Sequence, residues 1–358
     1  MRKVIALAVF AGALMVAGVA QAATWQVAAG EQTRAPAGTP KGTTLNAFYP
    51  SKLVINAGDS VTFASASFHT VTYPAGKPMP KLIVPDPAKG SYDALNDAAG
   101  TPFYFGGLPK LIYNGAAFVP VGGKSIVAGV PASSGILSPP TEKSPPAKAT
   151  YTFPKAGVFQ LLCGVHPGMK VAVTVKPAGT PVPLTATQVT AKAITDQAAA
   201  WAKSKALVAQ PVPKNTVYMG VGSAPTTLAF VPAKVTVKAG TAVRFINKSG
   251  TEPHDAAFGP VKYISNLSKT TDLFPQGPKS KNQTAPFYPY GSEPKGSYSY
   301  DGTNHGNGFL ATPLTIGSVS SFFTLPHAST VTFAKPGTYK FICFFHGDEM
   351  KGTVVVTP

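Results

Sequence analysis

Cysteine is nearly absent from this sequence: the 358 residues include only two, Cys163 and Cys343. A framework of several disulfides is therefore excluded. A single disulfide is also disfavoured, because the two cysteines occupy equivalent places in two repeats. Equivalent positions of separate domains rarely come within the ~7 Å between Cα atoms that a disulfide requires. A residue type used twice, each time with a histidine three positions later, indicates chemistry rather than cross-linking.

Acidic residues are also scarce, with 14 Asp and Glu against 31 Lys and Arg and a formal net charge of +17. The basic residues are scattered singly, without a basic helix or cluster, so we expect no binding to nucleic acid. A diffuse positive field instead favours solubility and attracts acidic partners. Charged residues make up only 13% of the chain, whereas Gly (35) and Pro (36) are frequent. This composition is typical of a turn-rich all-β protein.

Long apolar runs are absent except at the N-terminus. Residues 1–3 are cationic, residues 4–19 are almost wholly apolar, and Ala20-Gln21-Ala22 is a small-x-small cleavage site. An apolar run this short falls below the ~20 residues that span a bilayer, which favours a signal peptide over an uncleaved membrane anchor. We therefore expect a signal peptide over residues 1–22, cleavage after Ala22, and a periplasmic or otherwise exported protein without stable membrane insertion.

The sequence contains an internal duplication. Residues 48–63 and 230–245 share Phe, Pro, Gly, Val and Phe at a constant offset, and both read as strand, turn and strand. Residues 150–163 and 331–343 repeat a second pattern of strand, Gly turn and strand, and each ends at a cysteine. A chain this long exceeds one typical domain of ~150 residues. The duplication therefore predicts two copies of one fold.

These patterns place domain 1 at residues 23–176, a linker at 177–214 and domain 2 at 215–358. Each domain includes a long Gly- and Pro-rich insertion between its upstream histidine and its cysteine. The linker contains an Ala-, Lys- and Gln-rich stretch over 187–209 that predicts a helix, with an extended linker as the alternative. The residues expected on its buried face are Ile194, Ala198, Trp201 and Val208.

Four residues with metal-binding side chains recur in each half of the chain. The two predicted sets are His69, Cys163, His166 and Met169 in domain 1, and His254, Cys343, His346 and Met350 in domain 2. A thiolate, two imidazoles and a weak thioether suit copper that alternates between Cu(I) and Cu(II), because the trigonal arrangement resists the square plane that Cu(II) prefers. A Cys-x-x-His pair alone is weak evidence, since zinc sites use it as well.

The complete pattern resembles the cupredoxins, or blue copper proteins. The short loop from Cys163 to Met169 is similar to the ligand loop of amicyanin and plastocyanin-type proteins, and the spacing from His346 to Met350 is similar to that of azurin. The resemblance implies two tandem Greek-key β-sandwich domains with one type 1 copper ion each. It also implies electron transfer with redox partner proteins that dock on apolar residues around His166.

The second set differs from the first in ways that leave its axial ligand open. Glu349 lies three residues after His346, where Met169 falls in domain 1, so either Met350 or the Glu349 carboxylate is the axial group. Asp255 directly follows His254, where domain 1 has Thr70. Acidic groups favour Cu(II), so we expect the lower reduction potential at the second site; a turn-capping role for Asp255 is the alternative.

Cupredoxin-like enzymes, such as copper nitrite reductases and multicopper oxidases, need further histidines and a histidine directly before the cysteine. Leu162 and Ile342 hold that place here, and His305 and His327 are the only histidines left. We therefore expect an electron carrier and not an enzyme. The alternatives are a protein for copper sequestration or delivery, which the lack of a Met-rich tract disfavours, and a structural module with vestigial sites.

Overall fold

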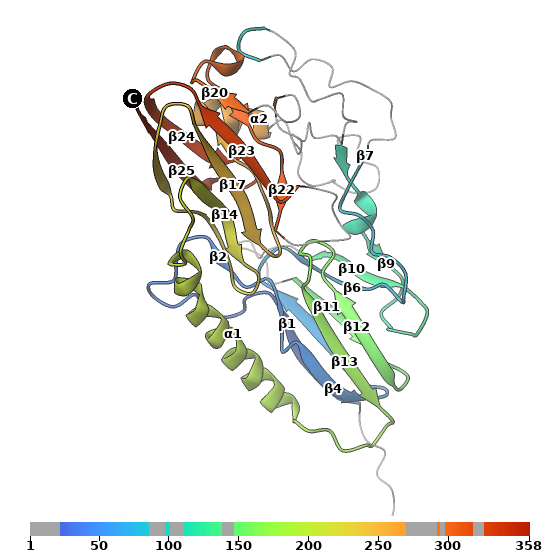
Figure 1. The fold of residues 1–358 in the computed structure, drawn as a ribbon. Coiled ribbons are helices and arrows are strands. Elements are labelled where there is room, and N and C mark those ends of the chain that lie inside the picture. Colours follow the sequence, from blue (N-terminus) through green and yellow to red (C-terminus); the bar gives the residue numbers. More distant parts are fainter. Residues whose placement is uncertain are drawn as a thin grey trace, which may run out of the picture.

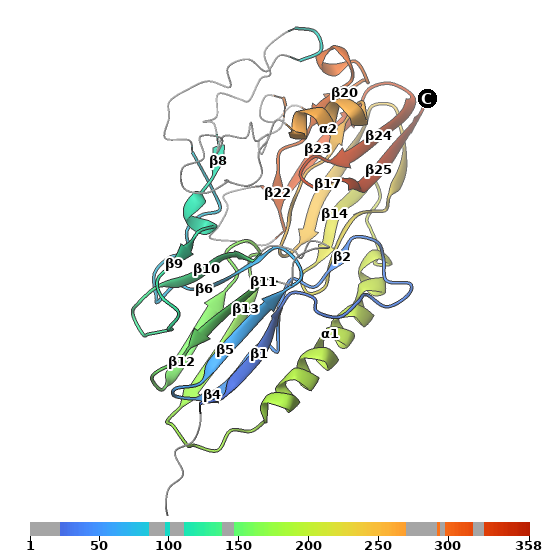
Figure 2. The same ribbon diagram turned by 180° about the vertical axis from the view of Figure 1, so that it is seen from behind.

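The computed structural model describes residues 22–85, 97–100, 111–137, 147–269, 292–293, 298–317 and 326–358. Almost all of the predicted signal peptide, residues 1–21, lies outside this part of the chain. No helix within the described residues is long and apolar enough to span a membrane. Figures 1 and 2 show two sandwiches of β-strands stacked end to end, with one long helix along their side.

Domain 1 is a sandwich of a four-stranded sheet, in the order β11-β5-β1-β3, and a six-stranded sheet, in the order β4-β13-β12-β6-β10-β9. Alternation of apolar and polar residues forms the strands: along β5, for example, Val61 and Phe63 are fully buried between more exposed neighbours. They pack against Leu161 and Val173 of the opposite sheet. The bounds are β1 Thr24–Ala29, β3 Phe48–Tyr49, β4 Lys52–Asn56, β5 Ser60–Ser65, β6 His69–Tyr73, β9 Pro120–Val121, β10 Ala132–Leu137, β11 Ala147–Thr152, β12 Gly157–Leu162 and β13 Lys170–Lys176.

Domain 2 has the same construction, with sheets in the orders β2-β15-β14-β17-β23-β20 and β16-β25-β24-β19-β21. Its core joins Val217 and Phe245 of one sheet to Phe341 and Val354 of the other. The bounds are β2 Thr43–Thr44, β14 Thr216–Gly222, β15 Thr226–Val231, β16 Lys234–Lys238, β17 Thr241–Ser249, β19 Ala257–Phe258, β20 Ser299–Tyr300, β21 Leu310–Ala311, β23 Ala328–Phe333, β24 Gly337–Cys343 and β25 Gly347–Thr357.

The two domains repeat one topology. The order β3-β1-β5-β11 corresponds to β15-β14-β17-β23, and β4-β13-β12-β6 corresponds to β16-β25-β24-β19. The same pairs are parallel in both copies: β1 with β5 and β14 with β17, then β4 with β13 and β16 with β25. The prediction of an all-β chain with two β-sandwich domains is confirmed.

The insertions, expected as ordered loops, contain short regular elements in their described parts. These are β7 Ile83–Pro85, β8 Leu111–Tyr113, η1 Gly115–Ala117, α2 Val261–Lys269, η2 Asn304–Gly306 and β22 Thr315–Ile316, which pairs with β18 Pro253–His254. Residues 86–96, 101–110, 138–146, 270–291, 294–297 and 318–325 lie outside the described part of the chain.

The predicted linker helix is present as α1, Ala186–Val208, and begins with a capping box between Thr185 and Gln188. The buried face differs from the expected one. Trp201 is buried as predicted, but Ile194 is 53% exposed and Ala198 is exposed. The buried residues instead follow the helical repeat through small and polar positions: Val189, Ala193, Gln197, Ala200, Trp201 and Ser204. Val208 is partly buried and packs with Val221 and Val231 of domain 2. The predicted face is therefore right at Trp201 and Val208 and wrong at Ile194 and Ala198.

Helix α1 packs against both domains. Trp201 packs with Leu45 and Tyr49 in domain 1, whereas Leu207, near the C-terminal end, packs with Val221 of domain 2. The Trp201 indole Nε1 donates a hydrogen bond to Thr33 Oγ1 at 3.1 Å. The helix therefore restrains the angle between the sandwiches.

The N-terminal region of the chain also contributes to domain 2. Strand β2 pairs antiparallel with β15, with Thr43 opposite Thr227, and becomes the edge strand of a domain 2 sheet. The Leu228 amide donates to the Gly42 carbonyl at 2.9 Å. A strand shared in this way resists separation of the domains, because separation would leave its backbone groups unpaired.

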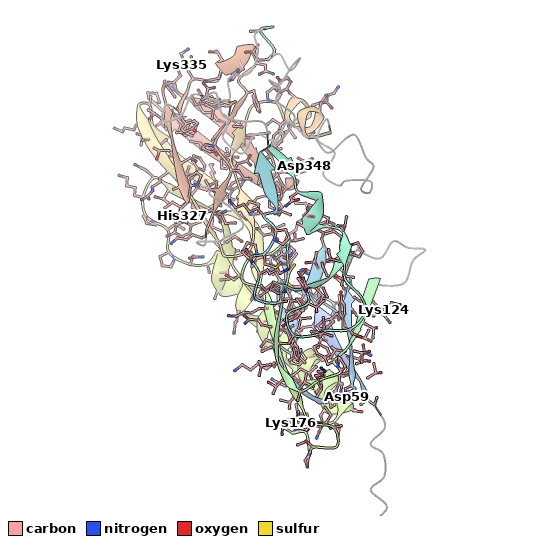
Figure 3. All side chains as sticks on the ribbon, turned by 90° about the vertical axis from the view of Figure 1, so that its right-hand side faces the viewer. Asp59, Lys124, Lys176, His327, Lys335 and Asp348 are labelled. Carbon is pink, nitrogen blue, oxygen red and sulfur yellow. The ribbon has the colours of Figure 1, made fainter. Side chains whose placement is uncertain are left out.

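Asp59 and His305 make polar contacts that hold parts of the chain away from the two triangles of His and Cys side chains. Asp59 lies at the end of domain 1 remote from domain 2 (Figure 3), where it accepts hydrogen bonds from Trp25 Nε1 at 2.8 Å and the Ala23 amide at 2.7 Å. Between the insertions, His305 contacts Asp97 at 3.1 Å and Glu293 at 2.7 Å. These contacts are structural and join residues far apart in the sequence.

Candidate metal centres

In domain 1 the sheet places three predicted ligands around one point. His69 begins β6, Cys163 directly follows β12, and His166 lies in the loop before β13. The distance between the two Nδ1 atoms is 3.0 Å, and Cys163 Sγ lies 3.8 Å from His69 Nδ1 and 3.6 Å from His166 Nδ1. All three side chains are buried.

Domain 2 repeats this triangle with His254, Cys343 and His346. The two Nδ1 atoms are 3.1 Å apart, and Cys343 Sγ lies 3.8 Å from His254 Nδ1 and 3.4 Å from His346 Nδ1. Both cysteines are free, so the prediction that they form no disulfide is confirmed. Within the described part of the chain, these triangles are the two groups in which three or more His, Cys, Asp or Glu side chains place one ligand atom each within 4.8 Å of one another.

The donor sets fit one metal ion each. Edges of 3.0–3.8 Å are the separations expected when two nitrogens and a sulfur each lie ~2.0–2.3 Å from a shared ion. Two buried imidazoles that turn the same nitrogen toward a thiol form a His₂Cys trigonal group, the arrangement of blue-copper sites. The described residues therefore contain two His-Cys-His groups that fit type 1 copper sites.

The surroundings of the methionines bear on the open question of the axial ligand. Met169 is 2% exposed and packs in the same core cluster as Cys163, and Met350 is 0% exposed in the cluster of Cys343. The Glu349 side chain is exposed to solvent. Of the two alternatives at the second site, burial favours Met350, because it alone lies in the interior with the thiol.

The residue after the first histidine holds the cysteine loop in both domains. Thr70 Oγ1 accepts the Gly164 amide at 2.6 Å, and Asp255 Oδ1 accepts the Phe344 amide at 2.6 Å. The Thr70 amide also donates to Cys163 Sγ at 3.4 Å. Asp255 therefore does accept a backbone amide, as the capping alternative predicts, but the amide belongs to the distant cysteine loop and not to its own turn.

The two thiols differ in charge environment because of this substitution. Burial raises the pKa of Cys163, but hydrogen bonds with His166 and His69 outweigh it and hold the pKa well below its ordinary value. Burial and the Asp255 carboxylate raise the pKa of Cys343 well above its ordinary value. Burial also raises the pKa of Asp255 to about 6. The second site therefore has a buried carboxyl group beside its thiol where the first site has the Thr70 hydroxyl.

In the wild type we expect copper in the second site to have a lower reduction potential than copper in the first. Asp255→Asn is expected to raise the potential of the second site, because it removes a carboxyl group beside the donors. Two unit charges on the order of 5 Å apart interact by ~3 kcal/mol at an effective dielectric constant of about 20. For a one-electron couple this corresponds to a change in reduction potential on the order of 100 mV. Asparagine keeps an oxygen for the Phe344 amide. A two-step redox titration measures the shift, with Asp348→Asn, whose side chain is 61% exposed, as the control. An unchanged potential contradicts the charge argument.

Two glycines that the sequence analysis missed make room for the first histidine of each site. Gly30, with φ +82°, follows β1, and Gly220, with φ +63°, lies at a bulge in β14. A Cβ at either position would overlap the ring of His69 or His254. In the sequence Gly30 ends an apolar run and Gly220 interrupts one, but neither pattern indicates contact with a histidine.

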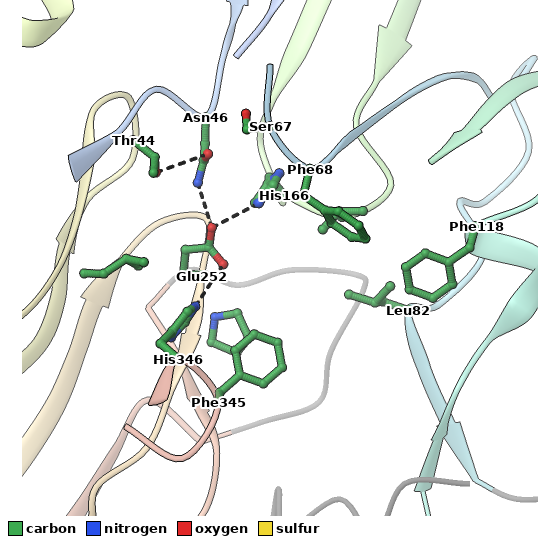
Figure 4. Close-up of a pocket in the computed structure, with 13 residues that line it drawn as sticks. Thr44, Asn46, Ser67, Phe68, Leu82, Phe118, His166, Glu252, Phe345 and His346 are labelled. Carbon is green, nitrogen blue, oxygen red and sulfur yellow. Dashed lines mark hydrogen bonds and ion pairs between the residues drawn. The ribbon is translucent and has the colours of Figure 1, made fainter. Parts of the chain in front are cut away.

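Glu252 is a further residue that the sequence analysis missed, and it lies between the two sites (Figure 4). Its Oε1 is 3.0 Å from His166 Nε2 and its Oε2 is 3.7 Å from His346 Nε2. Burial raises the pKa of Glu252, but the two imidazoles outweigh it and hold the pKa well below its ordinary value. The charge of Glu252 in turn outweighs burial at His166 and raises its pKa to about 10.

The apolar residues around His166 face the other domain. Pro167 is buried, and Val165 lines an interdomain cavity of about 290 Å³ with Phe68, Phe118 and Phe345. Figure 4 shows Glu252 between His166 and His346 on one side of this cavity and Phe118 near Leu82 on the other side. The apolar residues around His166, which the sequence analysis expects to form a docking surface, therefore lie on the side of domain 1 that faces domain 2.

No protein-family model matches the chain, and no curated protein matches it. Among solved structures it is similar to auracyanin A, a "blue" copper protein from the green thermophilic photosynthetic bacterium Chloroflexus aurantiacus, at 23% identity over 40% of this chain and 96% of that one, with a TM-score of 0.25. It is also similar to the Cu(I) form of an amicyanin mutant, at 17% identity over 42% and 89% with a TM-score of 0.21, and to a mutant fern plastocyanin, at 20% identity over 40% and 99% with a TM-score of 0.21. At these TM-scores the likenesses add no weight to the site geometry.

Proposed function

We propose that the protein is an exported electron-transfer protein with one type 1 copper ion in each domain. The observation that supports this most directly is the repeated triangle of two imidazole Nδ1 atoms and one thiol, with nearly the same edges in both domains. Copper bound there would supply one-electron redox chemistry between Cu(I) and Cu(II). His69, Cys163, His166 and Met169 would hold one ion.

The second ion would be held by His254, Cys343, His346 and Met350. In domain 1 the first histidine begins β6, which pairs with β12, and the cysteine directly follows β12. In domain 2 Cys343 ends β24, and His254 is held by the pairing of β18 with β22, three residues before the β19 partner of β24. The frame of strands therefore sets the separation of these donors without a metal. A rigid donor set limits the rearrangement between oxidation states. That favours electron transfer over a site that must open to release its ion.

The remaining histidines support a carrier over an enzyme with a further copper centre. Both ring nitrogens of His305 contact carboxylates, those of Asp97 and Glu293. His327 Nδ1 donates to the Ile316 carbonyl at 2.6 Å. Each of these two imidazoles therefore has a structural partner of its own.

Loading the metal-free mature protein with Cu(II) is expected to give two copper ions per chain, an intense blue colour, and loss of that colour on reduction by ascorbate. Metal analysis and visible absorption spectroscopy measure both quantities. Copper that binds without colour and is readily removed by a chelator would instead support sequestration or delivery. Preferential retention of zinc with the same stoichiometry would overturn the proposed redox role.

A further inference from the structure

Each candidate site turns the outer nitrogen of its second histidine toward the same carboxylate. Glu252 belongs to domain 2, yet its shorter contact, 3.0 Å, is with His166 of domain 1. Its contact with His346 of its own domain is longer, at 3.7 Å. The side chains of all three residues are at most 13% exposed. The carboxylate is therefore a largely buried link between the two donor sets.

The Glu252 side chain is held in place from both domains. Asn46, in the N-terminal region, donates from Nδ2 to Glu252 Oε1 at 2.8 Å and to Thr251 Oγ1 at 3.1 Å. On the domain 2 side, the Glu252 amide donates to Ser249 Oγ at 2.9 Å, and Asn247 Nδ2 donates to the Glu252 carbonyl at 3.0 Å. Since backbone and side chain are both fixed, the direction of the carboxylate is set before any metal binds.

A fixed carboxylate on one imidazole nitrogen determines what the other nitrogen can do. When Nε2–H donates to Glu252, the proton on Nε2 is retained, and Nδ1 is the nitrogen that gives up its proton to bind a metal. Such an outer partner also fixes the ring orientation and raises the basicity of the ligand. In His166 and His346 the nitrogens that face the thiols are the Nδ1 atoms, as this requires.

We propose that Glu252 is a shared positioning residue, which orients His166 in domain 1 and His346 in domain 2 and so prepares both metal sites from one point of the interface. This inference rests on the proposed function. It assigns to the domain interface a role in preparing the sites, because His166 of domain 1 meets its outer partner only when domain 2 is in place.

The test replaces Glu252 in full-length single-site proteins, Cys343→Ser to examine the first site and Cys163→Ser to examine the second. Cu(I) affinity is measured by competition with a colorimetric Cu(I) chelator. Glu252→Ala is expected to weaken the first site by about 10–100-fold, as loss of an outer carboxylate typically does, and the second site by a smaller factor because its contact is longer. Glu252→Gln, which can accept from only one imidazole, is expected to weaken at least one site.

Asp301→Ala is the control, because this carboxylate also belongs to domain 2 but pairs with Lys335 and contacts neither donor set. Its Cu(I) affinities are expected to match those of the parent proteins. A purely structural disturbance of domain 2 by Glu252→Ala would reduce affinity at the second site alone. Unchanged affinity at the first site would therefore overturn the proposal.

A metal-free measurement separates this inference from the proposed function. ¹⁵N NMR of the imidazoles in the apoprotein is expected to show protonated Nε2 in both His166 and His346, with the signals of both displaced in Glu252→Gln. If copper fails to bind the wild type, the proposed function fails while this readout still tests Glu252. If copper binds as expected and the His166 signals are insensitive to Glu252, the positioning role alone is wrong.

Discussion

Cys163→Ser is expected to leave a protein that binds one blue copper ion per chain, and Cys343→Ser is expected to remove the other ion. A serine hydroxyl is a harder and less easily ionised donor than a thiolate, so the substituted site loses the ligand that matches Cu(I). The two thiols lie in separate core clusters, each with its own methionine, so we expect the loss to be confined to one domain. Metal analysis and the visible absorption of the two variants measure this directly.

Each variant serves as the control for the other. A buried hydroxyl without a good partner destabilises a protein by ~1–3 kcal/mol, so thermal unfolding of the metal-free variants must be followed in parallel. Together, the two variants are expected to account for all of the wild-type colour. Retention of two blue ions in either variant would contradict the assignment of that cysteine as a ligand. Loss of both ions from a single substitution would contradict the independence of the sites.

The two His-Cys-His groups could be predicted because two members of each group lie in one short loop of the sequence. Cys163 and Cys343 each end a strand that a Gly turn precedes, and the next histidine follows at a fixed spacing within one loop. His69 and His254 could be placed because the duplication aligned them. The alternation of apolar residues then predicted the strands of the two sandwiches, which supply the rigid frame.

What could not be predicted depends on contacts between segments far apart in the chain. Glu252 lies in an ordinary polar turn of the sequence, and only the packing of domain 2 on domain 1 brings it to His166. The exchange of β2 into a domain 2 sheet is similarly invisible, because Thr43 and Thr44 form no distinctive pattern. Part of the buried face of α1 was predicted wrongly because it contains the polar Gln197. This side chain can be buried because its Oε1 accepts hydrogen bonds from the Gln32 and Thr33 amides, and the apolar pattern of the sequence gives no sign of these contacts.

Gly220→Ala is expected to weaken copper binding at the second site by at least tenfold while the first site keeps its affinity. The Gly220 backbone has φ +63°, where a side chain costs ~1–2 kcal/mol. The added Cβ would also overlap the ring of His254, which is 0% exposed. Overpacking of this kind costs ~1–3 kcal/mol, and relieving it by rotating the ring moves Nδ1 out of the donor triangle.

Gly240→Ala separates the two causes, because Gly240 has a similar positive φ of +81° but a Cβ there meets none of the described residues within 4 Å. Both variants are expected to lower the unfolding temperature of the metal-free protein, and only Gly220→Ala is expected to lower the Cu(I) affinity of the second site in chelator competition. Gly30→Ala is the reciprocal test, since its Cβ would overlap His69 and the loss should move to the first site. Equal copper affinity in Gly220→Ala and Gly240→Ala would show that the bulge in β14 does not position the His254 imidazole.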